Sequence, residues 1–208
     1  MAKMRPEDNF EDTNLVKRSK QGDAMAFAAL VNKYKKRIYF TAYQMTHNHS
    51  DADDLSQEAF LRAYRAIKGF NERSSFYTWI YRIAVNVSIN HLKKRSRYAD
   101  VSFDERIAVE SSADMRIAPT HADTPRELLR NKETEERITA AIDSLPVAQK
   151  TTIILVCMQD LSHKEAADIL RCPEKTISWR LYQARIKLKE KLGDLLGGKN
   201  YEYTLSND

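Results

Sequence analysis

The chain has 208 residues, of which 42% are hydrophobic and 30% are charged, and its formal net charge is +5. This length allows one large domain or two small ones, each with an apolar core. Gly and Pro number only 5 each, which argues against a sheet-rich fold with many tight turns. No stretch approaches the ~20 apolar residues of a membrane span, and the polar start of the chain lacks the apolar segment of a signal peptide. We therefore expect a cytoplasmic, all-α protein whose two cysteines, Cys157 and Cys172, are free thiols.

Charge is distributed unevenly along the chain. Residues 1–98 carry 18 Lys and Arg against 10 Asp and Glu, a net +8, whereas residues 99–124 carry 2 against 6, a net −4. Residues 125–208 carry 14 against 13, but within residues 171–191 there are 7 basic side chains and only 2 acidic ones. A basic stripe on one helix is the expected footprint of phosphate binding, although charge alone fits a solvated helix face equally well.

Two amphipathic helices are predicted near the start of the chain. Apolar residues recur at helical spacing over residues 27–45, opposite a face that carries the basic side chains of residues 33–37. Ser50 is the predicted cap of a second helix over about residues 51–68. Gly69 follows this helix, where a glycine commonly ends a helix.

The third predicted helix, over about residues 76–95, follows a short loop of residues 70–75. Its start combines four aromatic side chains with nearby arginines, and aromatic planes beside cations suit unpaired bases, which stack at roughly 1–3 kcal/mol each. The alternative is that the rings are core residues. Core packing is the favoured interpretation for Phe76 and Trp79, because they fall beside the inward stripe of the helix. The other residues of this cluster are Tyr77, Tyr81, Arg73, Arg82 and Asn86.

Residues 98–125 break the helical pattern: they show no sustained period, are acidic and contain two prolines. A segment this long without regular structure is unusual inside one compact domain. We therefore expect a flexible acidic linker that joins two small helical domains, residues 12–97 and residues 126–193. A polar tail follows over residues 194–208.

Helical spacing resumes at Pro125 and continues through Leu145. Pro146 is expected at the first position of the next helix, where its missing N–H is harmless. Residues 151–156, TTIILV, have the propensity of a strand. A helix is nevertheless expected there, because the sequence offers no partner strand and the helical register continues to Met158.

A helix-turn-helix is predicted over residues 162–191. Ser162 and Glu165 form a capping box that begins a short helix, and Pro173 ends that helix and allows a second one to begin. The second helix buries apolar residues spaced by three or four positions from Ile177 onward and presents a basic outer face. A generic helical hairpin is the alternative, which the basic outer face disfavours. The outer face carries Lys175, Thr176, Ser178, Trp179, Arg180, Tyr182 and Gln183.

Three segments of the chain, in this order, resemble a known family. They are DADDLSQEAFLRAYRAIKGF, SSFYTWIYRIAVN and LSHKEAADILRCPEKTISWRLYQARIKLKEKL. They are similar to the extracytoplasmic-function (ECF) sigma factors of bacteria, members of the sigma-70 family, and most closely to the envelope-stress type. The resemblance implies that residues 12–97 are sigma region 2, which binds core polymerase and the minus-ten element. It implies that residues 126–193 are region 4, which binds the minus-thirty-five element.

The resemblance implies a non-enzymatic sigma factor that binds core RNA polymerase, directs it to promoters and helps to melt the minus-ten region, in an envelope or stress response. The implied partners are the clamp helices and the flap of the polymerase, promoter DNA and an anti-sigma factor. Neither membrane insertion, nor a cofactor, nor a small-molecule substrate is implied. The linker of this family threads near the RNA exit path.

The family's motifs assign roles to residues of the N-terminal domain. The start of the second helix corresponds to the segment that binds the clamp helices, and its acidic side chains suit a basic partner as well as the dipole of their own helix. The loop after that helix corresponds to the one that captures a base flipped from the minus-ten element. The implied polymerase-binding residues are Asp54, Leu55, Gln57, Glu58 and Phe60. The implied minus-ten residues are Phe70, Asn71, Arg73, Ser74, Ser75, Tyr77, Arg82 and Asn86.

The outer face of the helix-turn-helix is the implied minus-thirty-five reader, and here the chain departs from its family. A small residue often precedes Thr176 in the family, where this chain has Lys175, and Arg followed by Ser often stands where this chain has Ser178 and Trp179. Gln183 replaces a further basic residue. Arg reads guanine by a bidentate fork and Gln prefers adenine, whereas Trp makes neither contact. We therefore expect a shifted minus-thirty-five preference.

Other functions fit parts of the sequence. A stand-alone helix-turn-helix regulator that binds operators is the main alternative, but it has no use for the aromatic and arginine side chains of the third helix. A helical scaffold that binds only proteins leaves the basic recognition helix unexplained. No metal site is expected, because His47 and His49 lie in a polar loop and the cysteines lack partners at zinc spacing. No catalytic residue is predicted, because no catalytic constellation stands out from the charged background.

Overall fold

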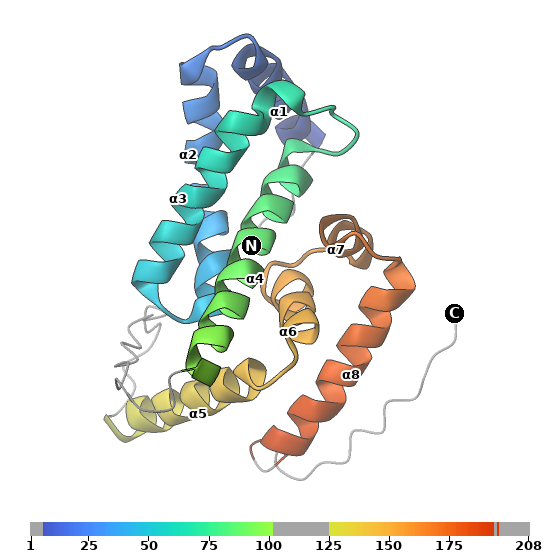
Figure 1. Ribbon diagram of the computed structural model, residues 1–208. Coiled ribbons are helices and arrows are strands. Elements are labelled where there is room, and N and C mark those ends of the chain that lie inside the picture. Colours follow the sequence, from blue (N-terminus) through green and yellow to red (C-terminus); the bar gives the residue numbers. More distant parts are fainter. Residues whose placement is uncertain (1–5, 102–124, 194, 196–208) are drawn as a thin grey trace.

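The computed structural model describes residues 6–101, 125–193 and 195 (Figure 1). Within these residues the chain is helical and contains no strand, which confirms the all-α prediction. The α-helices are α1 (Pro6–Lys20), α2 (Ala24–Thr46), α3 (His49–Ala66), α4 (Phe76–Val101), α5 (Pro125–Asp143), α6 (Val147–Ile153), α7 (His163–Leu170) and α8 (Glu174–Leu192). A 3₁₀ turn, η1 (Ile67–Gly69), follows α3, and a π-helix, η2 (Ile154–Met158), follows α6.

Helices α1 to α4 form an N-terminal bundle, in which α2 packs against α1, α3 and α4. The predicted apolar stripe of α2 faces this core: Leu30, Tyr34 and Ile38 are almost completely buried. The inward face of α3 includes three buried alanines, and small side chains at a contact allow two helix axes to approach closely. The inward faces predicted from apolar spacing are therefore confirmed for these two helices.

The boundaries of α3 differ from the prediction. Asn48 caps the helix, because its Oδ1 accepts a hydrogen bond from the backbone N–H of Asp51 at 2.9 Å. The predicted cap, Ser50, is wrong, since this residue already lies in the first turn. The helix ends at Ala66, and the chain then tightens into η1, so Gly69 lies one 3₁₀ turn beyond the helix end.

Helix α1 was not among the predicted helices. Its inward side carries the carboxylate of Asp12, which is buried and accepts hydrogen bonds from the Tyr34 hydroxyl and, at 2.8 Å, from Lys33 Nζ. Val16 is also buried against the bundle. Because α1 is attached partly by polar bonds to α2, its apolar residues alone do not form the long stripe that periodicity detects.

Helices α5 to α8 form a C-terminal unit around the buried start of η2 and the inner face of α8. Residues 151–156 are helical, as predicted, and span the junction of α6 and η2. The hydroxyls of Thr151 and Thr152 each donate to a carbonyl oxygen four residues earlier, at 2.7 Å, so that these buried polar groups are satisfied. Pro146 occupies the cap position of α6 and not the predicted first helical position.

Helices α7 and α8 form the predicted helix-turn-helix. The capping box is confirmed: Glu165 N donates to Ser162 Oγ at 3.2 Å, and Ser162 N donates to Glu165 Oε2 at 2.8 Å. The turn passes through Arg171, whose φ of 51° lies in the left-handed region, and α8 begins after Pro173. Ile177, Leu181 and Ala184 on the inner face of α8 are buried, as their spacing predicts, whereas Leu188 and Leu192 farther along the same face are only partly buried.

The N-terminal bundle and the C-terminal unit pack against each other. Helix α7 lies against α4 (Figure 1), and η2 contacts α2. Tyr81 of α4 donates its hydroxyl hydrogen to Gln159 Oε1 at 3.3 Å, and Arg82 Nη2 donates to the carbonyl oxygen of Asp168 in α7 at 2.6 Å. A face of α4 thus belongs to the interior of the whole molecule.

The predicted linker falls largely outside the described residues. Helix α4 continues to Val101, four residues into the segment expected to lack regular structure, and α5 starts at Pro125. The remaining linker residues, 102–124, and most of the predicted tail lie outside the described residues.

Candidate polymerase and nucleic-acid interfaces

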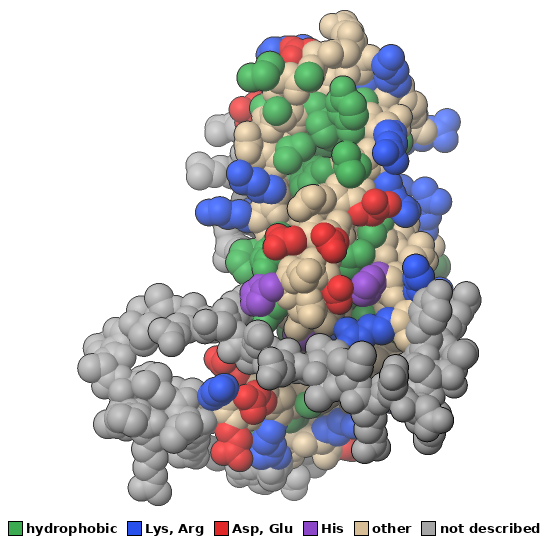
Figure 2. All heavy atoms as spheres, turned by 60° about the vertical axis from the view of Figure 1, so that its left-hand side comes forward, with side chains coloured by type: hydrophobic (Ala, Val, Ile, Leu, Met, Phe, Trp, Pro, Cys, Tyr) green, Lys and Arg blue, Asp and Glu red, His purple; other side chains and the backbone are tan. Residues whose placement is uncertain are grey.

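An open groove of about 860 Å³ runs between α2 and α3 on the outer face of the N-terminal bundle. Its lining is mainly aromatic and aliphatic, and the side chains of Leu61 and Tyr64 are about half exposed. Lys35 and Lys36 lie on its α2 side and Asp53 on its α3 side. Figure 2 shows hydrophobic side chains flanked by Lys and Arg on this face, with Asp and Glu side chains below them. An apolar centre with a charged rim is typical of a protein-binding surface.

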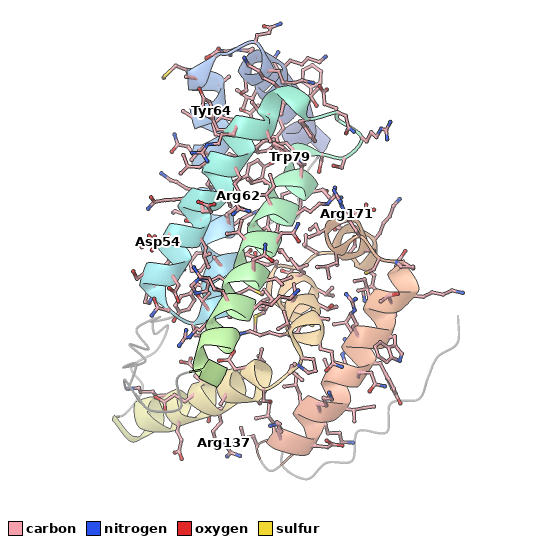
Figure 3. The ribbon with its side chains drawn as sticks, viewed as in Figure 1. Asp54, Arg62, Tyr64, Trp79, Arg137 and Arg171 are labelled. Atoms are coloured by element: carbon pink, nitrogen blue, oxygen red, sulfur yellow. The ribbon has the colours of Figure 1, made fainter. Side chains whose placement is uncertain are left out.

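The five predicted polymerase-binding residues divide into two sets. Asp54 and Gln57 are exposed on α3, and Glu58 is partly exposed and accepts a hydrogen bond from the next turn of the helix at 2.7 Å (Figure 3). Leu55 and Phe60 are each only 8% exposed. Phe60 lines the groove, whereas Leu55 packs into a separate small core. The exposed members of the set therefore form a polar edge beside the groove, and the buried members shape it.

A second, more polar pocket of about 400 Å³ lies where the loop before α4 meets α7. Figure 3 marks two of its lining residues, Trp79 of α4 and Arg171 at the end of α7. Six of the eight predicted minus-ten residues line this pocket together with Trp79 and Arg171. They are the loop residues Phe70, Asn71, Arg73, Ser74 and Ser75, and Arg82 of α4.

Arg82 is held at the boundary between the two units. Its Nη2 is bonded to the carbonyl oxygen of Asp168, while its buried Nε has no hydrogen-bond partner among the described atoms. Burial, and then the positive charge of Arg171, hold the pKa of the Arg82 guanidinium below its ordinary value. The pocket therefore concentrates positive charge that a phosphate group would neutralise.

Three predicted minus-ten residues differ sharply in exposure. Phe70 and Tyr77 are buried, at 5% and 4% exposure, whereas Asn86 is exposed on α4. The Tyr77 ring packs against Tyr81 with 4.6 Å between ring centroids, and burial raises the pKa of its hydroxyl. In this conformation neither Phe70 nor Tyr77 offers a free ring to a base. Trp79, for which core packing is predicted, is partly buried and stacks on Phe70 at 4.7 Å.

The seven predicted minus-thirty-five residues all lie on α8 or at its start. Lys175, Ser178, Trp179 and Tyr182 are exposed. The other three, Thr176, Arg180 and Gln183, are partly buried. The structure thus presents one aromatic and basic surface on the outer side of the helix-turn-helix, as an element that enters a DNA groove requires.

Some residues of these surfaces were not predicted from the sequence. Leu61 and Tyr64 lie outside the buried stripe of α3 and are exposed. Two large apolar side chains outside the predicted inward face were a usable sequence signal of a binding surface. Asp168 and Arg171 reach the polar pocket from α7. No sequence signal joins them to it, because the contact depends on the packing of two units that are distant in sequence.

The described residues contain no group of three or more His, Cys, Asp or Glu side chains placed to hold a metal ion. Among the same residues, no helix has both the length and the apolar character needed to cross a membrane. Cys157 is exposed and Cys172 is partly buried, and both are free thiols.

Sequence comparison identifies both halves of the chain. Residues 30–98 match the family described as Sigma-70 region 2, and residues 135–188 match the family described as Sigma-70, region 4. The RNA polymerase sigma-H factor of Pseudomonas aeruginosa is 33% identical over 189 residues, which cover 89% of this chain and 96% of that protein. The ECF RNA polymerase sigma factor SigW of Bacillus subtilis is 35% identical over 182 residues, 86% of this chain and 96% of that protein. The ECF RNA polymerase sigma-E factor of Escherichia coli K12 is 33% identical over 192 residues, which cover 91% of this chain and 98% of that protein.

Solved structures share the fold. CnrH, in complex with the cytosolic domain of CnrY, matches with a TM-score of 0.64 and 21% identity over 88% of this chain and 98% of that one. The sigma factor RpoE in complex with the anti-sigma factor NepR from Bartonella quintana matches with a TM-score of 0.58 and 23% identity over 80% of this chain and 96% of that one. With two region matches in the order of the two helical units and relatives similar over nearly their whole length, the chain belongs to the ECF sigma factors of the sigma-70 family, which direct RNA polymerase to promoters to initiate transcription.

Proposed function

We propose that this sigma factor binds core RNA polymerase through the α2–α3 groove and the acidic edge beside it, and that it serves an envelope or stress response. The groove supplies an apolar centre, while Asp54, Gln57 and Glu58 supply charge and hydrogen bonds at the rim. Leu55 and Phe60 act indirectly, because they are buried and hold the shape of α3. The partner surface is the pair of clamp helices of the largest subunit, whose basic side chains would complement this edge.

The polar pocket at the start of α4 is the proposed minus-ten site. Asn71, Arg73, Ser74 and Ser75 offer hydrogen-bond donors and positive charge to an unpaired base and its phosphates. Arg82 and Asn86 extend this surface along α4, and Phe70 and Tyr77 support it from within. Because Arg82 is bonded to Asp168 in the described conformation, its contact with DNA requires α7 to move away from α4.

The outer face of α8 is the proposed minus-thirty-five reader, with Lys175, Thr176, Ser178, Trp179, Arg180, Tyr182 and Gln183 as its residues. The same C-terminal unit also contacts the polymerase flap. We assign residues 12–97 to region 2, residues 98–125 to the linker, residues 126–193 to region 4 and residues 194–208 to a tail.

The protein works without catalytic residues and without a cofactor, because promoter melting uses binding energy to stabilise unstacked bases. It acts in the cytoplasm, where its polymerase and promoters are, and an anti-sigma factor controls it. One structural relative is a complex of this kind, because the sigma factor RpoE is bound to the anti-sigma factor NepR.

The observation that carries this proposal is the presence, in one chain, of the α2–α3 groove and of an exposed aromatic and basic face on α8. The test is run-off transcription from genomic fragments with purified core polymerase, with and without the full chain. Promoter-specific transcripts are expected only when the chain is present. A chain that binds duplex DNA but neither binds core polymerase nor yields such transcripts would instead be a stand-alone operator-binding regulator.

A further inference from the structure

The outer face of α8 carries an unusual apolar stripe for a surface that reads DNA. Trp179 is 59% exposed, Tyr182 is 54% exposed and Ile186 is 38% exposed. Their spacing of three and four residues puts them side by side on consecutive turns of the helix. The exposed cations Lys175 and Lys189 lie beside this stripe, and the exposed Arg185 lies at its edge. The positive charge suits the phosphates at the edges of a DNA groove and leaves the stripe facing its floor.

Trp179 is the central side chain of this face that remains free for a ligand. Its neighbour Ser178 is engaged, because its Oγ lies 3.1 Å from His163 Nδ1 and 3.4 Å from the carbonyl oxygen of Glu174. Arg180 points back toward the turn, where its Nη1 lies 3.9 Å from Cys172 Sγ. The two residues on either side of Trp179 are thus directed toward the protein, and the indole is directed away from it.

The chemistry of an indole selects among the four bases. Its ring is apolar, and its one polar group, the N–H of Trp179, can donate but cannot accept. In the major groove guanine offers two acceptors, cytosine a donor, adenine an acceptor beside a donor, and thymine an acceptor beside a methyl group. Thymine alone therefore offers both an apolar contact and a hydrogen-bond acceptor to one indole.

We infer that Trp179 reads thymine in the minus-thirty-five element through the C5 methyl group. This inference rests on the proposed function, because it requires α8 to enter the major groove of promoter DNA. The inference names thymine as the base that this helix reads where an arginine fork would read guanine. Tyr182 and Ile186 extend the same apolar surface, so one or two consecutive thymines fit the stripe.

The test begins with selection of minus-thirty-five sequences from a randomised promoter pool by the holoenzyme of core polymerase and the full chain. Each thymine of the selected element is then replaced by uracil, which removes only the methyl group. We expect the replacement at one or two positions to weaken promoter binding about three- to fivefold, the effect of one buried methyl group. With the Trp179→Ser holoenzyme the promoter position that Trp179 contacts should no longer distinguish thymine from uracil.

Two further variants keep the test decisive. Trp179→Phe retains an apolar ring and should retain a preference for thymine over uracil. Met25→Ser removes another exposed hydrophobic side chain, 77% exposed at the start of α2 and distant from α8 in sequence, and should leave the uracil effect unchanged. An unaltered uracil effect in Trp179→Ser, or its absence in the unmodified chain, would overturn the inference while leaving the sigma-factor proposal intact. Failure of the holoenzyme to select any sequence would contradict the proposed function itself.

Discussion

Asp54 and Arg82 show how the setting of a single charged residue decides its role. Asp54 projects from α3 beside the apolar groove, where its carboxylate is free to meet a cation on a partner (Figure 3). Arg82 is partly buried, is bonded to the backbone of α7 and has a lowered pKa because of burial and Arg171. Asp54 is therefore ready to bind a partner. Arg82 must exchange the carbonyl oxygen of Asp168 for an acceptor on DNA when it contacts the promoter.

Reversal of the charge at Asp54 tests the polymerase-binding edge. Asp54→Lys should weaken binding to core polymerase by roughly tenfold, because a favourable charge contact becomes a repulsive one. Binding is measured by fluorescence anisotropy of the labelled full chain against purified core enzyme. Glu133→Lys, the same reversal at an exposed position on α5, is the matched control. Equal affinities for the two variants would remove Asp54 from the interface.

The aromatic residues at the start of α4 mark the limit of prediction at this scale. Their spacing places Phe76 correctly in the core. Tyr77 and Trp79 belong to the same short run, yet only the structure shows that Tyr77 is enclosed and Trp79 partly accessible. A residue's exposure here depends on the neighbouring loop and on α7, which lies far away in the sequence.

At the scale of helices, local signals decide where an element begins. The capping box of α7 was predictable because all of its partners lie within four consecutive residues. The cap of α3 was misassigned because Asn48 and Ser50 are both good capping residues and only the backbone geometry distinguishes them. The π-helix η2 was not predictable, since an extra residue per turn is selected by packing and leaves no mark in the apolar pattern.

Substitution of the two serines tests these cap assignments. Ser162→Ala should lower the free energy of unfolding by about 1 kcal/mol, because the backbone N–H of Glu165 loses its acceptor. Ser50→Ala should change it by less than about 0.5 kcal/mol, because Ser50 is an exposed residue in the first turn. Urea denaturation followed by circular dichroism measures both. A larger effect at Ser50 than at Ser162 would contradict the observed caps.

At the scale of the whole molecule, the association of the two units depends on contacts between distant residues. The bonds Tyr81–Gln159, Arg82–Asp168 and Lys150–Met45 join residues that are 78, 86 and 105 positions apart. Apolar spacing predicts which face of a helix is inward but not which distant element covers it. The sequence therefore predicted two helical domains, and their packing against each other was found only in the structure.

Lys150 forms one of these contacts from a buried position. Its Nζ donates to the carbonyl oxygen of Met45 and to Asp143 Oδ1, both at 2.6 Å. The carbonyl of Met45 belongs to the last turn of α2, where backbone acceptors lack partners within the helix and a cation is favourable. A residue of α6 thus completes the end of a helix in the other unit.

Removal of this ammonium group tests how strongly it joins the units. Lys150→Met should lower the free energy of unfolding by about 1–3 kcal/mol, since a buried carbonyl and a carboxylate lose their donor. Lys164→Met, at an exposed position on α7, should change stability by less than about 0.5 kcal/mol. Urea denaturation gives the stabilities, and small-angle scattering reports whether the Lys150 variant is less compact. Equal stability of the two variants would show that the contact does not contribute.

The same contact makes the packing of the two units sensitive to acid. Burial alone would raise the pKa of Asp143, but the imidazole of His47, whose Nε2 lies 3.1 Å from Asp143 Oδ1, and the hydrogen bond from Lys150 outweigh burial and hold that pKa below the ordinary value of 3.8. A carboxyl group whose pKa is lower in the folded state stabilises that state above its unfolded pKa, and this stabilisation is lost as the pH falls through the folded pKa. The stability difference between the unmodified chain and Asp143→Asn should therefore be constant near neutral pH and should decrease once the pH falls below about 4. Urea denaturation of both proteins across this range measures it, and Asp54→Asn, at an exposed carboxylate on α3, provides the control. A difference that grew on acidification would mean that the packed units favour protonated Asp143, contrary to the placement of His47 and Lys150 beside its carboxylate.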